Sequence, residues 1–204
     1  MTYSRKISPR LAAACIAATV LFAGCNKKAD NTLNYLNAVN TYYSAHPACL
    51  WASSQQFPQQ AGTSDHEKTM PLDALVDQGL LVRSTADKKV MIIVSKQFNN
   101  YDLSDKGRSA WTPDSTQPGF GNFCYGHRKA TAIDSATPTS DQPGATTQVS
   151  YHYTFGDAPA WATAAETQNA YPDLHTNLSG PHTDTATLTN TSNGWTLSTP
   201  STTP

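Results

Sequence analysis

Charged residues are scarce in this chain, and the positive ones are not clustered. The 204 residues include 14 lysines and arginines and 15 aspartates and glutamates. No run of basic residues follows residue 28, whereas proteins bind nucleic acids through clustered positive charge that neutralises phosphates. The sequence therefore predicts no nucleic-acid partner.

The chain also lacks the short motifs of common enzymes and cofactor sites. It contains no HExxH zinc helix, no GxSxG nucleophile turn, no Walker loop, no dinucleotide glycine pattern and no EF-hand calcium loop. The six histidines are scattered, and no two cysteines have CxxC spacing. We therefore predict no metal, no cofactor and no catalytic residues, and an enzyme is the less favoured of two hypotheses.

Long apolar runs are absent except at the N-terminus. Residues 11–23, LAAACIAATVLFA, follow Arg5, Lys6 and Arg10, and the polar stretch NKKADN begins at residue 26. The run is too short for a transmembrane helix, which needs about 20 apolar residues. A basic start followed by an apolar run of this length is typical of a secretory leader, so we predict that residues 1–24 are a signal peptide.

The stretch LFAGC at the end of this leader resembles the lipobox of bacterial lipoproteins. In that family small residues precede a cysteine that is diacylated and becomes the first residue of the mature chain, and here Ala23 and Gly24 precede Cys25. The resemblance implies lipidation of Cys25, attachment to a membrane through acyl chains, and a cell-envelope location. Asn26 stands where an inner-membrane retention signal has Asp, which favours the outer membrane facing the periplasm. Ordinary secretion and a buried N-terminal helix are the alternatives.

Two cysteines remain after this assignment. Cys15 leaves with the leader and Cys25 carries lipid, so Cys49 and Cys124 are left. Two such cysteines in an oxidising compartment most often pair. The sequence predicts a disulfide with Cα atoms about 4.4 to 6.8 Å apart; two free buried thiols and a thiol nucleophile are the alternatives.

The first half of the mature chain has helical periodicity. After a lipidated tether at residues 25–31, a helix capped by Thr32 is predicted from apolar residues three to four positions apart: Leu33, Leu36, Val39 and Tyr43. A polar loop is expected next. A second helix is predicted over residues 71–78, with Gly79 as its C-cap.

The segment around residues 70–111 resembles the closing part of winged-helix domains. In that family a helix ends in Gly-Leu-Leu, a strand leads into a wing, and a Tyr-x-Leu-Ser pattern starts the next helix. The matching residues are Gly79, Leu80, Leu81, Tyr101, Leu103, Ser104 and Gly107. The resemblance implies a helical, winged-helix-like half over residues 32–115, in which Ser104 caps a helix. A basic recognition helix is missing, so the resemblance concerns architecture and not DNA binding.

In the second half, residues 116–199, the periodicity changes to two. VSYHYTF alternates Val149, Tyr151, Tyr153 and Phe155 with polar residues, which predicts a half-buried antiparallel strand. We expect its partner strand at residues 122–137, one helix over residues 158–171, and a hairpin at Asn193 and Gly194. The predicted fold class is α+β: a helical, winged-helix-like first half packed with an antiparallel β-rich second half carrying one helix, before a frayed tail at residues 200–204.

Candidate binding residues are concentrated in the second half. They are four aromatic residues and one histidine: Tyr151, Tyr153, Trp161, Trp195 and His152. Core packing is the alternative explanation of the aromatic residues, since aromatic side chains dominate burial in small cores. An acid–base role for His152 requires a carboxylate partner.

Two functions follow from these observations. The favoured hypothesis is a lipid-anchored cell-envelope protein, a non-enzymatic module that binds an envelope protein or a cell-wall ligand. The alternative is a periplasmic hydrolase with dispersed catalytic residues. A cleft in which a histidine, a carboxylate and a hydroxyl converge would favour the hydrolase.

Overall fold

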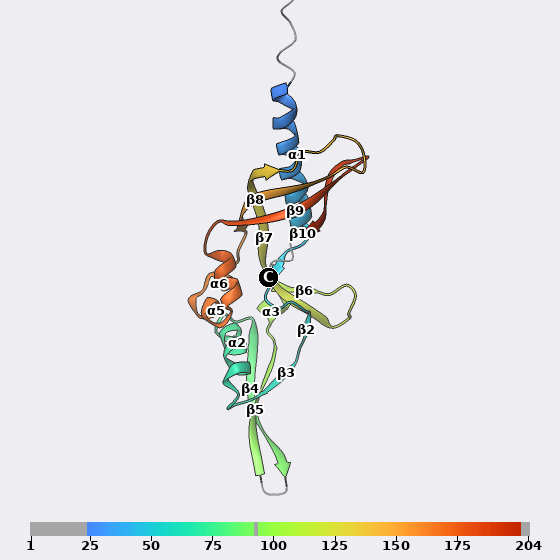
Figure 1. Cartoon of the computed structure of the whole chain (residues 1–204). Coiled ribbons are helices and arrows are strands. Elements are labelled where there is room, and N and C mark those ends of the chain that lie inside the picture. Colours follow the sequence, from blue (N-terminus) through green and yellow to red (C-terminus); the bar gives the residue numbers. More distant parts are fainter. Residues whose placement is uncertain (1–23, 92–93, 201–204) are drawn as a thin grey trace, which may run out of the picture.

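The protein consists mainly of antiparallel β-sheet (Figure 1). The computed structural model describes the backbone of residues 24–91 and 94–200 and the side chains of residues 31–87 and 96–198. The larger sheet has the order β1-β7-β8-β9-β10, with β2 and β6 also paired to β7. Its strands are β1 (Ala48–Cys49), β2 (Gln55–Gln56), β6 (Trp111–Pro113), β7 (Phe120–Ala136), β8 (Thr146–Gly156), β9 (His182–Thr191) and β10 (Gly194–Pro200).

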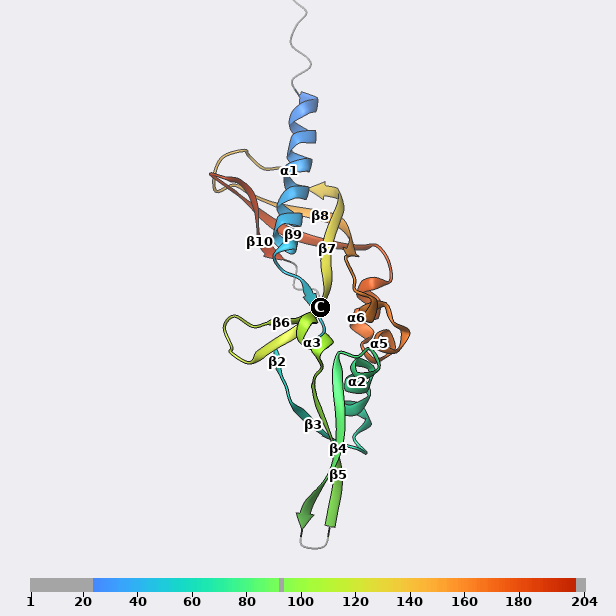
Figure 2. The ribbon, with the colours of Figure 1, turned by 180° about the vertical axis from the view of Figure 1, so that it is seen from behind.

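A smaller sheet and five short helices form the other end of the molecule. The smaller sheet has the order β3-β5-β4, from β3 (Gln59–Gly62), β5 (Val94–Leu103) and β4 (Leu81–Met91). The helices are α2 (His66–Asp77), α3 (Asp105–Ala110), α4 (Ala160–Thr163), α5 (Ala165–Ala170) and α6 (Pro172–Leu178). The hairpin of β4 and β5 projects from this end, opposite the long helix α1 (Gly24–Ser44), as both views show (Figures 1 and 2).

Helix α1 covers one face of the larger sheet and builds the first of two cores. The buried α1 residues are Tyr35, Ala38, Val39 and Tyr43, spaced three to four apart. They meet inward-facing residues of β7, β8 and β9: Ala130, Val149, Tyr151, Tyr153, Ala186 and Leu188. Since successive strand residues alternate between faces, each strand contributes every second side chain.

Asn40 joins α1 to an irregularity in β7. The register between β7 and β8 shifts between Ala130 and Ala132. The Asn40 amide donates to the Ala130 carbonyl at 3.1 Å and accepts from the Ala130 N–H at 2.8 Å. These two bonds satisfy backbone groups that would otherwise be costly to bury.

The second core connects the two sheets. It contains buried residues of α2, β4, β5, β7, α4 and α6, among them Leu75, Tyr101, Phe123, Trp161 and Leu174. Trp51 and Trp111 pack against the ring of Phe123, and Phe57 packs against Trp111. This core therefore holds segments of both halves of the chain.

The predicted α+β fold class, with a helical, winged-helix-like first half, is wrong, because the chain is mostly antiparallel β-sheet with small helices. The residues expected to form a helical, winged-helix-like half contain six strands, and β1, β2 and β6 pair with β7 of the second half. Segments of two to four residues, such as β2 and β3, are too short to show a periodicity, so their sequence resembles a polar loop. These segments form strands because they pair with strands that lie far away in the sequence.

Three helix predictions need correction. Helix α1 begins at Gly24 and not after Thr32, so the stretch expected as a tether is helical. Leu33 is 57% exposed, because the buried face is centred on Tyr35, Ala38 and Val39. The single helix expected over residues 158–171 is divided into α4 and α5, and a further helix, α6, starts at Pro172.

Several local predictions are confirmed. The Ser104 side chain accepts a hydrogen bond from Gly107 N–H and caps α3. Gly79 follows the end of α2 with φ of 71°, the left-handed conformation that favours glycine there. Strand β8 buries Val149, Tyr151 and Tyr153, and β9 and β10 form the expected hairpin.

The disulfide between Cys49 and Cys124 is present. The two residues lie opposite each other in the antiparallel pair of β1 and β7. Their Cα atoms are 3.8 Å apart, closer than the predicted 4.4 to 6.8 Å. Residues 1–23, most of the predicted signal peptide, and the Cys25 side chain lie outside the described part of the chain.

Candidate functional site

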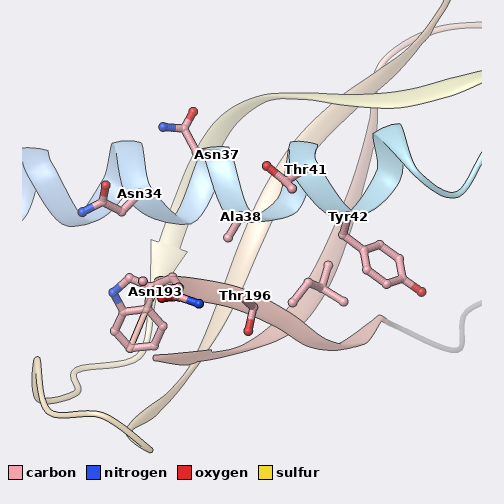
Figure 3. Close-up of a pocket in the computed structure, with 10 residues that line it drawn as sticks. Asn34, Asn37, Ala38, Thr41, Tyr42, Asn193 and Thr196 are labelled. Carbon is pink, nitrogen blue, oxygen red and sulfur yellow. The ribbon is translucent and has the colours of Figure 1, made fainter. Parts of the chain in front are cut away.

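A groove of about 470 Å³ lies between α1 and β10 (Figure 3). Such a volume is in the range of small-ligand sites, about 300 to 1,000 Å³. Its walls combine amides, hydroxyls and apolar groups: Asn34, Asn37, Asn193, Thr41, Thr196, Tyr42, Ala38, Gly194, Trp195 and Leu197. The two walls come from segments more than 150 residues apart in the sequence.

The helical wall follows from the position of the buried face of α1. Tyr35, Ala38 and Val39 point into the core, so the neighbouring ridge of Asn34, Asn37 and Thr41 is exposed beside β10. Residues three to four apart share one side of a helix. Within the described residues, the amides of Asn34 and Asn37 form no hydrogen bond and are free to bind a ligand.

The strand wall belongs to the last strand in the order of the larger sheet. Trp195 and Leu197 of β10 face the first core and are half-buried. The Trp195 ring packs edge to face with Tyr35 of α1, with ring centroids 5.0 Å apart. These contacts hold the two walls of the groove together.

The groove is electrically neutral. None of the described residues that line it is an Asp, Glu, Lys, Arg or His. General acid–base catalysis needs a positioned side chain that gives and takes a proton, most often His and otherwise chiefly Asp, Glu or Lys. The lining can hold a neutral ligand by hydrogen bonds and apolar contact, but it is poorly suited to catalysis.

A second cleft, of about 330 Å³, lies beside α6 and contains an ion pair. Arg128 binds the Asp184 carboxylate at 2.8 Å. Its guanidinium also lies over the rings of Tyr43 and Tyr153, 5.1 and 4.7 Å from their centroids. The Arg128 guanidinium already contacts the Asp184 carboxylate and two tyrosine rings. This cleft therefore offers a ligand little unpaired charge.

Two tyrosines near Arg128, Tyr151 and Tyr153, have a raised pKa. Burial raises the pKa of Tyr151, and its hydrogen bond to the Tyr43 hydroxyl at 3.2 Å adds to the effect. Burial likewise raises the pKa of Tyr153. These phenols therefore serve as packing and hydrogen-bonding groups and not as bases.

The predicted binding residues do not form one surface. Tyr151 and Tyr153 are buried in the first core, with ring centroids 5.9 Å apart. Trp161 is buried in the second core against Phe123, and Trp195 lines the groove. His152 is exposed on the sheet face opposite α1. Of the five residues, Trp195 alone lines the groove.

His152 has a carboxylate partner, as an acid–base role would require. Its Nδ1 lies 2.7 Å from Oδ1 of Asp134 on the neighbouring strand β7. The pair lies on an exposed strand face. It lines neither the groove nor the cleft beside α6, nor two smaller hollows near Trp51. No histidine lines any of these four hollows, so the convergence that would favour a hydrolase is not found in them.

No family model, curated protein or solved structure matches this chain. Among the described residues, no three metal-binding side chains converge. Nor does any described helix have the length and apolar content needed to cross a membrane.

The sequence does not predict the polar wall of the groove. The spacing of the apolar residues of α1 predicts its buried side, whereas Asn34, Asn37 and Thr41 have the same spacing on the adjacent side. A ridge of uncharged polar residues next to an apolar stripe is the signal that could have found them. Nothing in the sequence indicates that β10 lies opposite this ridge.

Proposed function

We propose that this protein is a lipid-anchored component of the cell envelope that binds a neutral partner, without catalysis, in the groove between α1 and β10. The observation that carries the proposal is the groove itself. It is large enough for a ligand, amide and hydroxyl groups line it, and charged residues are absent from its described lining.

The position of α1 supports the anchoring. The lipobox-like stretch ends at Cys25, and α1 begins at Gly24, at one end of the elongated molecule (Figure 1). Two or three acyl chains on Cys25 hold a protein stably on a membrane, where one would not. The β4–β5 hairpin then points away from the membrane.

A hydrolase is the second candidate, because His152 and Asp134 form a close pair. A general base must also lie within reach of a bound substrate, and this pair lies on an open strand face. Binding without catalysis is therefore the favoured function, and hydrolysis is the second candidate.

The proposal is tested in the native envelope. Mass spectrometry of the purified protein is expected to find Cys25 as an acylated N-terminus, and Cys25→Ser is expected to release the protein from membranes. A photo-crosslinking amino acid at Thr196, in the groove, is expected to give a defined adduct that the same probe at exposed Val82 does not give. An unmodified Cys25, or identical adducts from both positions, would contradict the proposal.

A further inference from the structure

The outer edge of β10 presents peptide groups that its own sheet does not use. Strand β10 ends the order of the larger sheet. Asn190 of β9, the partner of Trp195, bonds through its N–H and C=O to the opposite side, to Ala145 and Gly144. Asn190 and Trp195 are therefore an opposed pair without mutual hydrogen bonds, so Trp195, and Leu197 two residues on, direct their N–H and C=O groups away from β9. Two donors and two acceptors thus lie along the groove.

From Gly194 to Leu197 this edge lacks the usual protection against pairing with another strand. Natural edge strands are commonly blocked by charged side chains, prolines or bulges. The stretch Gly194 to Leu197 carries no charge and no proline, and the irregularity between Leu197 and Thr199 lies beyond it. A segment of about four residues is therefore open to strand addition.

We propose that the groove binds an extended, uncharged segment of another envelope protein, which adds to β10 as an extra strand. The backbone of this segment pairs with Trp195 and Leu197, and every second side chain enters the groove toward Asn34 and Asn37. The inference rests on the proposed function and specifies the class of ligand. A charged side chain would lose its hydration in a neutral lining, which restricts the segment to apolar and uncharged polar residues.

The orientation of α1 argues against a second copy of this chain as the occupant. In Figure 3, α1 and β10 run in the same direction along the groove. Two copies related by a two-fold axis would pair their β10 strands antiparallel, so their α1 helices would also be antiparallel. The two Cys25 anchors would then point in opposite directions and could not enter the same membrane surface.

The helix also sets the height of the groove above the membrane. Helix α1 is continuous from Gly24 to Ser44, and a helix rises about 1.5 Å per residue. Asn34 and Tyr42 follow Cys25 by 34 − 25 = 9 and 42 − 25 = 17 residues, which is roughly 14 and 26 Å along the axis. The segment that binds is therefore membrane-proximal, such as the stretch beside the anchor of another membrane protein.

The test uses a phage-displayed library of linear dodecapeptides, panned against the folded protein without its leader. We expect enriched peptides that are uncharged over at least four residues. In hydrogen-exchange NMR such a peptide should slow exchange of the Leu197 and Trp195 amides by about tenfold or more. Methylating the peptide nitrogens that face β10 should abolish binding, whereas methylating those on the opposite edge should not.

Two matched variants test whether the α1 wall of the groove contacts the bound peptide. Asn34→Asp combined with Asn37→Asp keeps the side-chain shapes but adds charge, and should weaken the selected peptide at least tenfold. Leu33→Asp adds charge to the same helix at an exposed position outside the groove and should leave binding within about twofold. Equal weakening by both variants would overturn the proposal.

Other probes separate this inference from the proposed function. Binding of chitotetraose in the groove, without peptide enrichment, would overturn strand addition but leave a neutral-ligand site in place. A dimer in sedimentation experiments that protects the Trp195 and Leu197 amides would make a second copy the occupant. Lack of binding by both probes, together with lack of a crosslink from Thr196, would overturn both statements.

Discussion

Arg128 shows how a single charged residue is accommodated at the edge of a core. Its side chain is 23% exposed and that of its partner Asp184 is 8% exposed, so both charges have lost most of their water. Their mutual attraction and the rings of Tyr43 and Tyr153 replace that hydration. Loss of one partner of such a pair strongly destabilises the fold, because the remaining charge stays buried without a partner.

We expect Asp184→Ala to lower the free energy of unfolding by about 3 kcal/mol, because it leaves Arg128 partly buried and unpaired. The matched control is Arg83→Met, which breaks the pair of Arg83 and Asp73. These side chains are 44% and 33% exposed, and the loss should be below about 1 kcal/mol. Urea denaturation of both variants measures the difference. Equal losses would mean that burial does not determine the strength of these pairs.

Asp114 provides a pH-dependent contribution at the residue scale. Hydrogen bonds from the Thr116 hydroxyl and the Ser54 hydroxyl, at 2.6 and 2.7 Å, lower the pKa of this carboxyl to about 2. Because the folded pKa is lower than the unfolded value of about 3.9, the contribution to stability is present above pH 4. It is lost as the pH falls through about 2.

We expect Thr116→Val to raise the pKa of Asp114 toward its unfolded value, since the strongest hydrogen bond is removed. Carboxyl chemical shifts recorded between about pH 1.5 and 6 measure this pKa. Thr131→Val removes a hydroxyl from another part of the sheet and should not move it. A normal Asp114 pKa in the unmutated protein would contradict the hydrogen-bond geometry.

At the scale of secondary-structure elements, the sequence predicts those features whose cause is local. Strand β8 was found because alternation of Tyr151 and Tyr153 with polar residues directly reflects its two faces. The Ser104 cap depends on a contact three residues away and was also found. Strands β1, β2 and β6 were missed because each has two or three residues and exists through its pairing with β7.

The candidate site was predicted only in part, for the same reason. Trp195 was predicted as one of the second-half aromatic residues that could form a binding surface. The opposite wall, Asn34 and Asn37, depends on which side of α1 meets the sheet. Tyr35 is buried and Leu33 is exposed, because the packing of α1 against β7 and β10 determines which side of the helix faces the sheet.

Helix α3 approaches the start of β4 so closely that a glycine is required. A Cβ atom at Gly107 would lie 1.9 Å from the carbonyl oxygen of Leu80. Alanine favours helix by about 1 kcal/mol over glycine, but here α3 would have to move away from Leu80. Overpacking of this kind typically costs about 1 to 3 kcal/mol.

We therefore expect Gly107→Ala to destabilise the protein by about 2 kcal/mol in spite of its higher helix propensity. Gly180→Ala is the control, since nothing lies within 4 Å of the added Cβ atom there. It should change stability by less than about 0.5 kcal/mol. Thermal and urea unfolding measure both variants, and a stabilised Gly107→Ala would show that α3 does not pack as described.

At the scale of the whole molecule, β7 connects the parts. It pairs with β8 in its second half and with β1, β2 and β6 in its first. The disulfide links Cys124 of β7 to Cys49, which follows the end of α1 by five residues, 49 − 44 = 5. The crosslink therefore fastens α1, one wall of the groove, to the strand that both cores share.

The disulfide should be a large contributor to the stability of the whole molecule. It closes a loop of 75 residues, for which the chain-entropy model gives about 4.5 kcal/mol as an upper value. In a protein of this size each kcal/mol shifts the Tm by about 2 to 4 °C, so reduction should lower the Tm by roughly 10 °C. Differential scanning calorimetry with and without dithiothreitol measures this shift. A double Cys49→Ser, Cys124→Ser variant should melt at the reduced value with or without dithiothreitol, and an unmutated protein whose Tm does not respond to reduction would contradict the prediction.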